Sequence, residues 1–271
     1  MRGKQRRGLS ILFTALCIGM TSSAVQYCHD RLGDESTLTG WTLLVATAGL
    51  YLLTVRKKWI RAKLGPVAAW LQMHAYLGTY ASIVFLMHIG WPIQGQFELA
   101  MAAVFVIVAG SGVMLGVLSR STPKRLAALE QDYQLERIPV LQASVAQDAH
   151  AAALRSAALG EGATLSEYYQ RRLLPFFHSQ RGWVYTLFPN GILRRKLLRE
   201  LGDLERYLAE QGQGCQQNLV RMVKSKDDLD FHAALQNRLR LLFAGHVALT
   251  WSLAIMVGVH VVLVYRFQGA M

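Results

Sequence analysis

The sequence lacks strand-like alternation, internal repeats and low-complexity runs, and it is poor in cysteine and in acidic residues. The absence of alternating apolar and polar positions argues against β-strands, so we expect an all-α protein. Three cysteines, Cys17, Cys28 and Cys215, form neither a C-x-x-C nor a C-x-x-C-H motif. This spacing supports neither a zinc ribbon nor covalent attachment of a c-type haem.

Long apolar runs are the main feature that the sequence does have. The chain of 271 residues is 52% hydrophobic, and five runs approach the roughly 18 residues that cross a hydrocarbon core of about 30 Å. They are Leu9–Tyr27, Thr39–Val55, Val67–Trp91, Glu98–Leu118 and Leu241–Tyr265. We therefore expect an integral membrane bundle of five transmembrane helices. The first run could instead be a signal peptide, because bases precede it, but no A-x-A cleavage site closes it.

Basic residues gather beside one end of these runs. The chain has 29 lysines and arginines against 17 acids, and its formal net charge is +12. Bases cluster at residues 2–7 and 56–63, whereas the opposite loops hold mostly acids: Asp30, Asp34, Glu35 and Glu98. Because cytoplasmic loops are the basic ones, we predict a multi-pass protein of the inner (cytoplasmic) membrane with a cytoplasmic N-terminus and an extracytoplasmic C-terminus. Anionic membrane lipid then meets the positive charge, and no nucleic-acid partner is needed to explain it.

A polar stretch of about 120 residues separates the fourth run from the fifth. We expect residues 1–118 to hold transmembrane helices 1 to 4 and residues 119–240 to form a helical cytoplasmic insert. Residues 241–271 would then hold transmembrane helix 5 and a short extracytoplasmic tail.

Apolar spacing and capping signals predict several helices in this insert. We expect one that begins near Pro123, one over Val140–Leu159, a short one from Thr164 to near Pro175, and one from Asn190 to about Gln211, closed by Gly212. Asp227–Arg240 contains no helix breaker before the fifth run. One long helix is therefore expected to begin in the cytoplasm and to continue through the membrane.

Four of the eight histidines fall inside apolar runs. His74 and His88 lie in the third run, and His246 and His260 lie in the fifth. Ionisable groups are expensive in hydrocarbon, so we interpret these four as functional. Both pairs have the same spacing, from position i to position i+14. That spacing is nearly four turns, about 1,400°, so the two imidazoles share one helix face and lie about 21 Å apart along the axis.

The two helices run in the same direction, so their histidines match in depth, His74 with His246 and His88 with His260. Two imidazoles on facing helices are the ligands that a six-coordinate haem iron requires. The sequence therefore predicts two b-type haems (haem b), stacked across the bilayer. The structural alternative is that each histidine hydrogen-bonds a neighbouring helix, although identical spacing at matched depths is hard to reach that way. Zinc or copper suits the pattern less well, because their ligands gather within one or two turns.

Other residues could contact these haems. Gly78, between the two histidines of the third run, is small enough for a macrocycle edge to approach. Propionates are anionic and need cations near the membrane surface, for which Arg61 and Arg240 are candidates. Each arginine could equally be an anchor that extends to the interface.

A shifted register is also conceivable, because His232 precedes His246 by the same interval that separates His246 from His260. Asp230 and Arg240 argue instead that His232 lies outside the apolar core, at the membrane interface. His29, His150 and His178 show no partner pattern, and we interpret them as surface or loop residues.

The spacing His74-x13-His88 and His246-x13-His260 resembles the di-haem membrane cytochromes b, most closely the ferric reductase-like transmembrane domain of ferric reductases and NADPH oxidases. In that family two haems lie between the third and fifth helices, each of which bears two histidines at this spacing. The resemblance covers the five membrane helices, about half of the chain. The family's flavin and nicotinamide domain is not found, since the sequence stops soon after the fifth run, and the insert contains no G-x-G-x-x-G or P-loop motif.

The resemblance implies a transmembrane electron-transfer protein, a cytochrome b subunit of an oxidoreductase complex. Its partner would be a flavin or iron–sulfur protein docked on the insert, or a quinone beside one haem. A non-redox membrane anchor or assembly protein, or a haem transporter, are the alternative functions.

Overall fold

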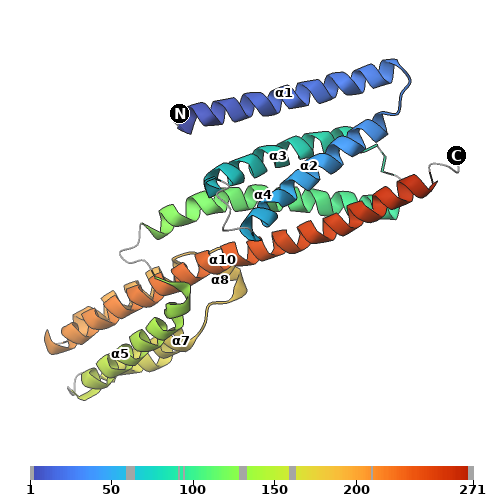
Figure 1. Cartoon of the computed structure of the whole chain (residues 1–271). Helices are drawn as coiled ribbons and strands as arrows, with labels where there is room; N and C mark the ends of the chain where they lie inside the picture. The colour runs from blue at the N-terminus through green and yellow to red at the C-terminus, as the bar shows by residue number, and fades with distance from the viewer. Residues whose placement is uncertain are drawn as a thin grey trace. The chain divides into compact units, whose positions relative to one another are not determined.

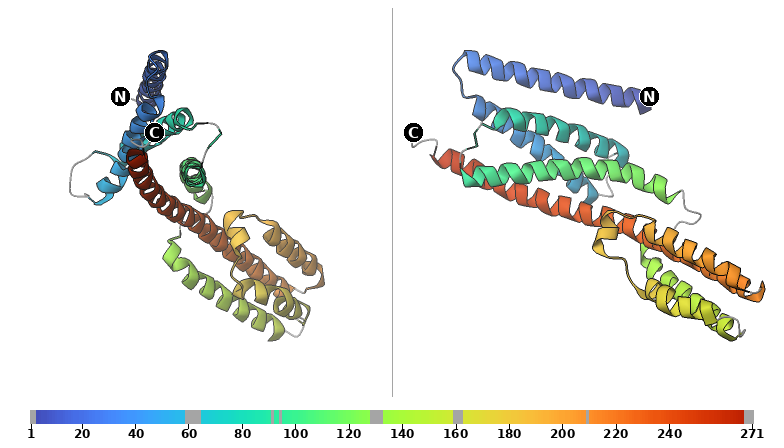
Figure 2. Two further views of the ribbon diagram at one scale, coloured as in Figure 1. Left: turned by 90° about the vertical axis from the view of Figure 1, so that its right-hand side faces the viewer. Right: turned by 180° about the vertical axis from the view of Figure 1, so that it is seen from behind.

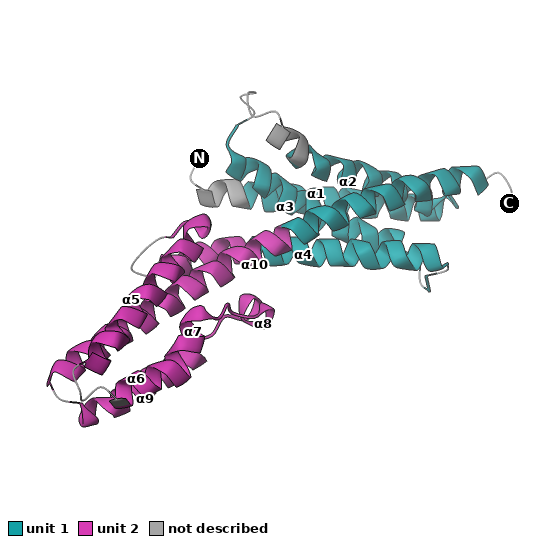
Figure 3. Cartoon of the chain, turned by 90° about the horizontal axis from the view of Figure 1, so that it is seen from below, with its two compact units in different colours: residues 1–116, 244–271 teal, residues 117–243 magenta. Residues whose placement is uncertain are grey.

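The computed structural model describes residues 3–58, 65–90, 92–93, 95–127, 133–158, 163–208 and 210–267. Helices make up the regular structure of these residues (Figure 1), which confirms the all-α prediction. The chain divides into two compact units (Figure 3): unit 1 comprises residues 1–116 and 244–271, and unit 2 comprises residues 117–243. The cytoplasmic location of the insert stays a prediction.

Unit 1 is built from long helices. They are α1 (Gly3–Asp30), α2 (Glu35–Lys58), α3 (Val67–His88), most of α4 (Gln96–Leu126) and the C-terminal part of α10 (Glu210–Phe267). The α2 and α3 helices pack along each other, and α1 packs against both. Figure 2 shows the same neighbours from two further sides.

Four of these helices are long and apolar enough to cross a membrane: Gly8–Asp30, Glu35–Leu53, Gln96–Leu126 and Glu210–Phe267. They correspond to four of the five predicted spans. The α3 helix has 22 residues, but Gln72, His74 and two tyrosines interrupt its apolar positions and lower its mean hydropathy. Trp91, the predicted end of the third span, lies outside the described residues.

Unit 2 contains the shorter helices and the N-terminal part of α10. The shorter helices are α5 (Ile138–Ala158), α6 (Ala163–Tyr168), α7 (Leu174–His178), α8 (Trp183–Leu187) and α9 (Ile192–Leu204). Its core is formed by alanines of α5 against leucines of the other helices. Residues with no exposed surface there include Ala149, Ala152, Leu165, Leu173, Leu201 and Leu219.

Several predicted helix ends differ from the structure. Pro123, expected to begin a helix, lies inside the last turn of α4, where it has no N–H to donate to the carbonyl oxygen four residues before it. The helix expected to stop near Pro175 runs on to His178, because a π-helical turn over Tyr169–Leu173 precedes the proline. Such a turn shifts the hydrogen-bond pattern by one residue and so accommodates a ring that an α-helix rejects.

The helix expected to reach Gln211 instead ends at Leu204, and Gly212 lies inside α10. A Cβ at Gly212 would come within 3.3 Å of the Leu208 side chain, so glycine allows the chain to fold back closely as α10 begins. At its other end, α9 begins at Ile192 with Gly191 as its N-cap, close to the expected start at Asn190. Asn190 Oδ1 accepts a hydrogen bond from the Ile192 N–H at 3.2 Å.

The prediction of one long helix is confirmed by α10, which has 58 residues and a length of about 87 Å at 1.5 Å per residue. It begins at Glu210, several turns before the Asp227 of the predicted segment.

Candidate functional site

The His88 side chain is held by α2. Its Nδ1 lies 3.0 Å from Oγ1 of Thr39, a residue that is only 1% exposed. The Thr39 hydroxyl also lies 2.7 Å from the Glu35 carbonyl oxygen of its own helix. A hydroxyl has one hydrogen, and when it donates that hydrogen to the carbonyl, Oγ1 can only accept from the Nδ1–H of His88. This network favours the tautomer in which Nε2 keeps its lone pair.

His246 has the same arrangement with a different helix. Its Nδ1 lies 2.8 Å from Oγ of Ser111 on α4, and that oxygen lies 2.8 Å from the Val108 carbonyl oxygen. Here too, when the Ser111 hydroxyl donates to its own helix, Oγ can only accept from the Nδ1–H of His246. Metal-binding histidines commonly donate one ring N–H to such an acceptor and bind the metal through the other nitrogen.

A glycine follows each of these hydroxyl residues and makes room for the imidazole. A Cβ at Gly40 would lie 3.1 Å from His88 Cε1, and a Cβ at Gly112 would lie 3.3 Å from His246 Cε1. Each ring therefore rests against a helix surface without side-chain atoms. We call Thr39–Gly40 and Ser111–Gly112 the two hydroxyl–glycine cradles. Sequence reasoning missed them, although a hydroxyl–glycine pair inside an apolar run was a visible signal.

His88 and His260 line one cavity of unit 1, with a volume of about 300 Å³. Its wall is mostly apolar and comes from α2, α3, α4 and α10. Phe85 and Phe105 stack at 4.1 Å between ring centroids on one side, and Trp41 lies 6.3 Å from Tyr265 on another. Besides the two imidazoles, its wall includes three hydroxyl residues of α2, namely Ser36, Thr37 and Thr47, together with Trp41 and Tyr265. This volume lies at the lower end of the range for ligand pockets.

The four predicted ligands therefore have different local surroundings. The structure brings His88 and His260 to one cavity. The α3 and α10 helices each run without interruption through both of their histidines. The matched depth of His74 and His246 stays a prediction from helix geometry. All four side chains are half-buried.

Of the other predicted contact residues, the structure describes Gly78 and Arg240, and both lie on helix surfaces. Gly78 faces α2, where a Cβ would lie 3.9 Å from Leu50. Arg240 is exposed on α10. Arg61 lies outside the described residues.

The remaining histidines lie apart from this cavity. His232 has no exposed surface and lies in unit 2, where its ring meets the edge of Tyr133 at 5.2 Å. His29 lies 2.5 Å from Glu35 at the surface. Among the described residues, no three histidine, cysteine or acidic side chains gather as a metal site would require.

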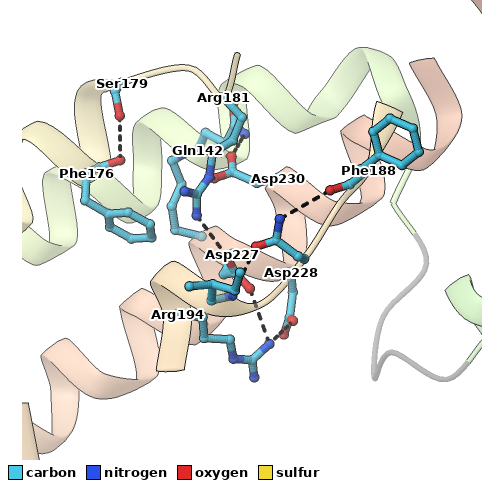
Figure 4. A network of polar contacts seen from close by, with 12 residues as sticks. Gln142, Phe176, Ser179, Arg181, Phe188, Arg194, Asp227, Asp228 and Asp230 are labelled. Carbon is cyan, nitrogen blue, oxygen red and sulfur yellow. Dashed lines mark hydrogen bonds and ion pairs between the residues drawn. The ribbon is translucent and has the colours of Figure 1, made fainter. Parts of the chain in front are cut away.

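A second polar cluster lies within unit 2 (Figure 4), where three aspartates of α10 meet cations from other segments. Arg181 lies 2.9 Å from both Asp227 and Asp230, and Arg194 lies 2.6 Å from Asp228. Lys226, 2% exposed, lies 2.5 Å from Asp230. Burial raises the pKa of the Asp227 carboxyl, and the positive charges of Arg181 and Arg194 oppose that rise. These pairs join α9 and the segment before α8 to α10.

Comparison with known proteins finds no match among family models, curated proteins or solved structures. The fold alone defines the class, an all-α protein with four helices apolar enough to span a membrane.

Proposed function

We propose that unit 1 is a transmembrane cytochrome b that holds two b-type haems, one between His88 and His260 and one between His74 and His246. The observation that carries this proposal is the repeated hydroxyl–glycine cradle. It directs Nδ1 of one histidine at each level toward a helix hydroxyl, and leaves Nε2 available to an iron. A histidine that served only to join helices would need no such repetition at two levels.

The chemistry of the residues fits haem. Neutral imidazole nitrogens are good ligands for haem iron, and two at one level complete its axial coordination. The cavity lined by His88 and His260 has the aromatic and aliphatic wall that suits a flat apolar macrocycle. Gly40 keeps the His88 ring against α2.

A bound haem would supply reversible one-electron transfer at its iron. The chain's own residues do the rest. The imidazoles bind the iron, the Thr39 and Ser111 hydroxyls fix their tautomers and orientation, and the apolar wall excludes water, which influences the reduction potential. Ligands at two levels about 21 Å apart along α3 and α10 divide the thickness of the membrane between two sites.

Such a chain would be a multi-pass inner-membrane protein in which α3 crosses the membrane in addition to α1, α2, α4 and α10. Its N-terminus would lie in the cytoplasm and its C-terminus outside. It would act as an electron-transfer subunit of an oxidoreductase complex. A flavin or iron–sulfur protein on unit 2, or a quinone beside one haem, would exchange electrons with it. The apolar outer surface of unit 1 supports a lipid surrounding, and the pattern of basic loops supports the orientation.

The test is haem content after expression with ample haem, measured by pyridine haemochrome and by reduced-minus-oxidised spectra. We expect two haems per wild-type chain and one in both His88→Ala and His260→Ala. His74→Ala and His246→Ala should each lose the other haem. His178→Ala, which changes a histidine of unit 2, should keep both.

A colourless wild-type protein would overturn the proposal in favour of a membrane anchor or assembly factor. Haem that exchanges readily and is not reduced by membrane donors would overturn it in favour of a haem transporter. Haem loss spread evenly over all five variants would contradict the pairing.

A further inference from the structure

Unit 2 exposes a set of large apolar side chains that its core does not bury. Between Trp183 and Leu193, six large apolar residues are exposed. Their exposed fractions are Trp183 75%, Phe188 73%, Ile192 63%, Val184 55%, Leu187 39% and Leu193 37%. We call this set the α8 surface. A patch of this kind on a surface rich in charged residues marks an interaction site.

The α8 surface combines residues of α8, of its C-cap and of the first turn of α9. Trp183 and Leu187 are four residues apart on α8, Phe188 is the C-cap that follows Leu187, and Ile192 and Leu193 begin α9. Tyr185 points away from them, and the Arg181 guanidinium lies 4.9 Å from its ring. Burial raises the pKa of the Tyr185 hydroxyl, so this phenol stays neutral. One side of α8 therefore belongs to unit 2 and the other faces out.

A hydrogen bond fixes the level of α8 along α10. Arg238 Nη1 donates to the Leu187 carbonyl oxygen at 3.2 Å. The apolar run that begins at Leu241 follows three residues later, about 4.5 Å along the helix axis. The end of α8 thus lies beside the point where α10 changes from charged to apolar.

Exposed bases follow the α8 surface on α9. Arg195, Lys196 and Arg199 are exposed, whereas Arg194 is engaged by Asp228. Aromatic side chains next to lysine and arginine are typical of segments that lie in the membrane interface, where rings enter the headgroup region and cations meet anionic lipid.

We propose that α8 is an interfacial anchor that inserts Trp183, Val184 and Phe188 into the cytoplasmic leaflet of the membrane and binds anionic headgroups through the exposed bases of α9. The anchor would hold unit 2 at the membrane surface beside the start of the α10 span. This inference rests on the membrane placement of α10 in the proposed function, but not on haem.

Nitroxide labels on the full chain test the proposal. The protein, with Cys17, Cys28 and Cys215 replaced by serine, is placed in nanodiscs of phosphatidylcholine and phosphatidylglycerol. Labels are attached in Val184→Cys and Phe188→Cys, and collision with oxygen is compared with collision with a polar nickel chelate. Leu154→Cys on α5, 59% exposed, is the aqueous control, and Ile255→Cys on α10, 68% exposed, is the lipid control.

We expect labels at 184 and 188 to favour oxygen, as at 255, and the label at 154 to favour nickel. In discs without phosphatidylglycerol, the labels at 184 and 188 should become more accessible to nickel. If they match 154 while 255 stays protected, the α8 surface lies in water and the anchor is refuted. Protection of both labels from both reagents would refute it in favour of a second copy of the chain. Nickel access at 255 would refute the membrane placement itself.

Discussion

The two units differ in how far their large apolar side chains are exposed. In unit 1, Leu12 and Phe13 are 66% and 67% exposed. In unit 2, Leu201 and Leu219 have no exposed surface, and the charged Lys226 is buried as well. Unit 2 thus encloses an aliphatic core with buried ion pairs, whereas unit 1 exposes many large apolar side chains, a surface that suits a lipid surrounding.

The units also satisfy their polar groups differently. In unit 1, hydroxyls bond to carbonyl oxygens of their own helix, as in Thr42 to Leu38 at 2.8 Å and Ser82 to Gly78 at 2.8 Å. In unit 2, side chains reach other elements, as Gln216 does to the Leu201 carbonyl at 2.9 Å. Lipid offers no partner to a polar group, so local pairing is the safe solution in the membrane. Some hydroxyls of unit 1 do reach another helix, as Thr21 does to Tyr80 at 2.8 Å and Tyr51 to the Thr250 carbonyl at 2.7 Å. Thr39 and Ser111 belong to this smaller group, and their partners are histidines.

The largest predicted effect is loss of the buried ion cluster of unit 2. Asp230→Ala leaves Lys226, 2% exposed, without its carboxylate, and we expect a loss of about 3–5 kcal/mol in the free energy of unfolding. The thermal midpoint of unit 2 should fall by about 10–20 °C. The midpoint is measured as the temperature at which a thiol-reactive dye labels Cys215, which packs against the core of unit 2. The other two cysteines are removed by Cys17→Ser and Cys28→Ser.

Asp203→Ala is the matched control. Its carboxylate is 66% exposed and lies 3.6 Å from Arg206, a pair worth about 0–1 kcal/mol. Equal midpoints for the two variants would mean that the buried cluster does not stabilise unit 2.

The same substitution in the two units should have different effects. Leu201→Ala removes a side chain with no exposed surface and should destabilise unit 2 by about 2–5 kcal/mol. Leu12→Ala removes one that is 66% exposed on α1 and should change stability by about 0.5 kcal/mol or less. Thermal midpoints in detergent check both. A large effect of Leu12→Ala would show that α1 buries that face.

Helix positions were readable from the sequence because apolar spacing depends on local geometry alone. Four of the long apolar helices and the continuity of α10 were predicted. The end of α9 at Leu204 was not predicted. Gly212 does not stop that helix but lies close to the Leu208 side chain, where a Cβ would be crowded. Glycine within a sequence does not reveal which of these roles it has.

The candidate site was readable only in part. The four histidines could be picked out as candidates from their spacing, because an interval close to four whole turns places two side chains on one helix face. The partners Thr39 and Ser111 come from α2 and α4, and no periodicity within one helix encodes which residue of another lies opposite. The cavity shared by His88 and His260 likewise depends on the packing of four helices.

The cradle hydroxyls should matter for haem binding more than hydroxyls of the same type elsewhere in unit 1. Thr39→Val keeps the shape of the side chain but removes the acceptor of the His88 Nδ1–H. We expect about 10–100-fold weaker haem retention at that level, with a shift in midpoint potential. Ser111→Ala should do the same at the His246 level. Transfer of haem to apomyoglobin and a redox titration measure the two effects.

Thr42→Val is the matched control on α2, because the described hydrogen bond of Thr42 is to the carbonyl oxygen of Leu38. If it released haem as fast as Thr39→Val, the hydroxyl would act on the α2 helix and not on the histidine.

A smaller effect than loss of a cradle hydroxyl is predicted for Asp34, which caps α2. Its Oδ1 accepts hydrogen bonds from the N–H groups of Ser36 at 2.9 Å and Thr37 at 3.2 Å, and its other oxygen accepts from the Thr37 hydroxyl. The Ser36 hydroxyl also donates to Oδ1 at 2.6 Å. This bond first, then those from Thr37, lower the pKa of Asp34 from 3.8 to about 2. Because the folded pKa is the lower one, the stabilisation is complete above about pH 4 and is lost as the pH falls toward 2.

Amide hydrogen exchange in the first turn of α2 measures this cap. At pH 6 we expect Asp34→Ala to lower the free energy of protection from exchange there by about 1 kcal/mol. The effect is small because the carboxylate is exposed. The difference from wild type should shrink below pH 4. Asp34→Asn, which caps without a charge, should protect equally at both pH values. If its protection also fell with pH, a group other than Asp34 would be titrating at this end of α2.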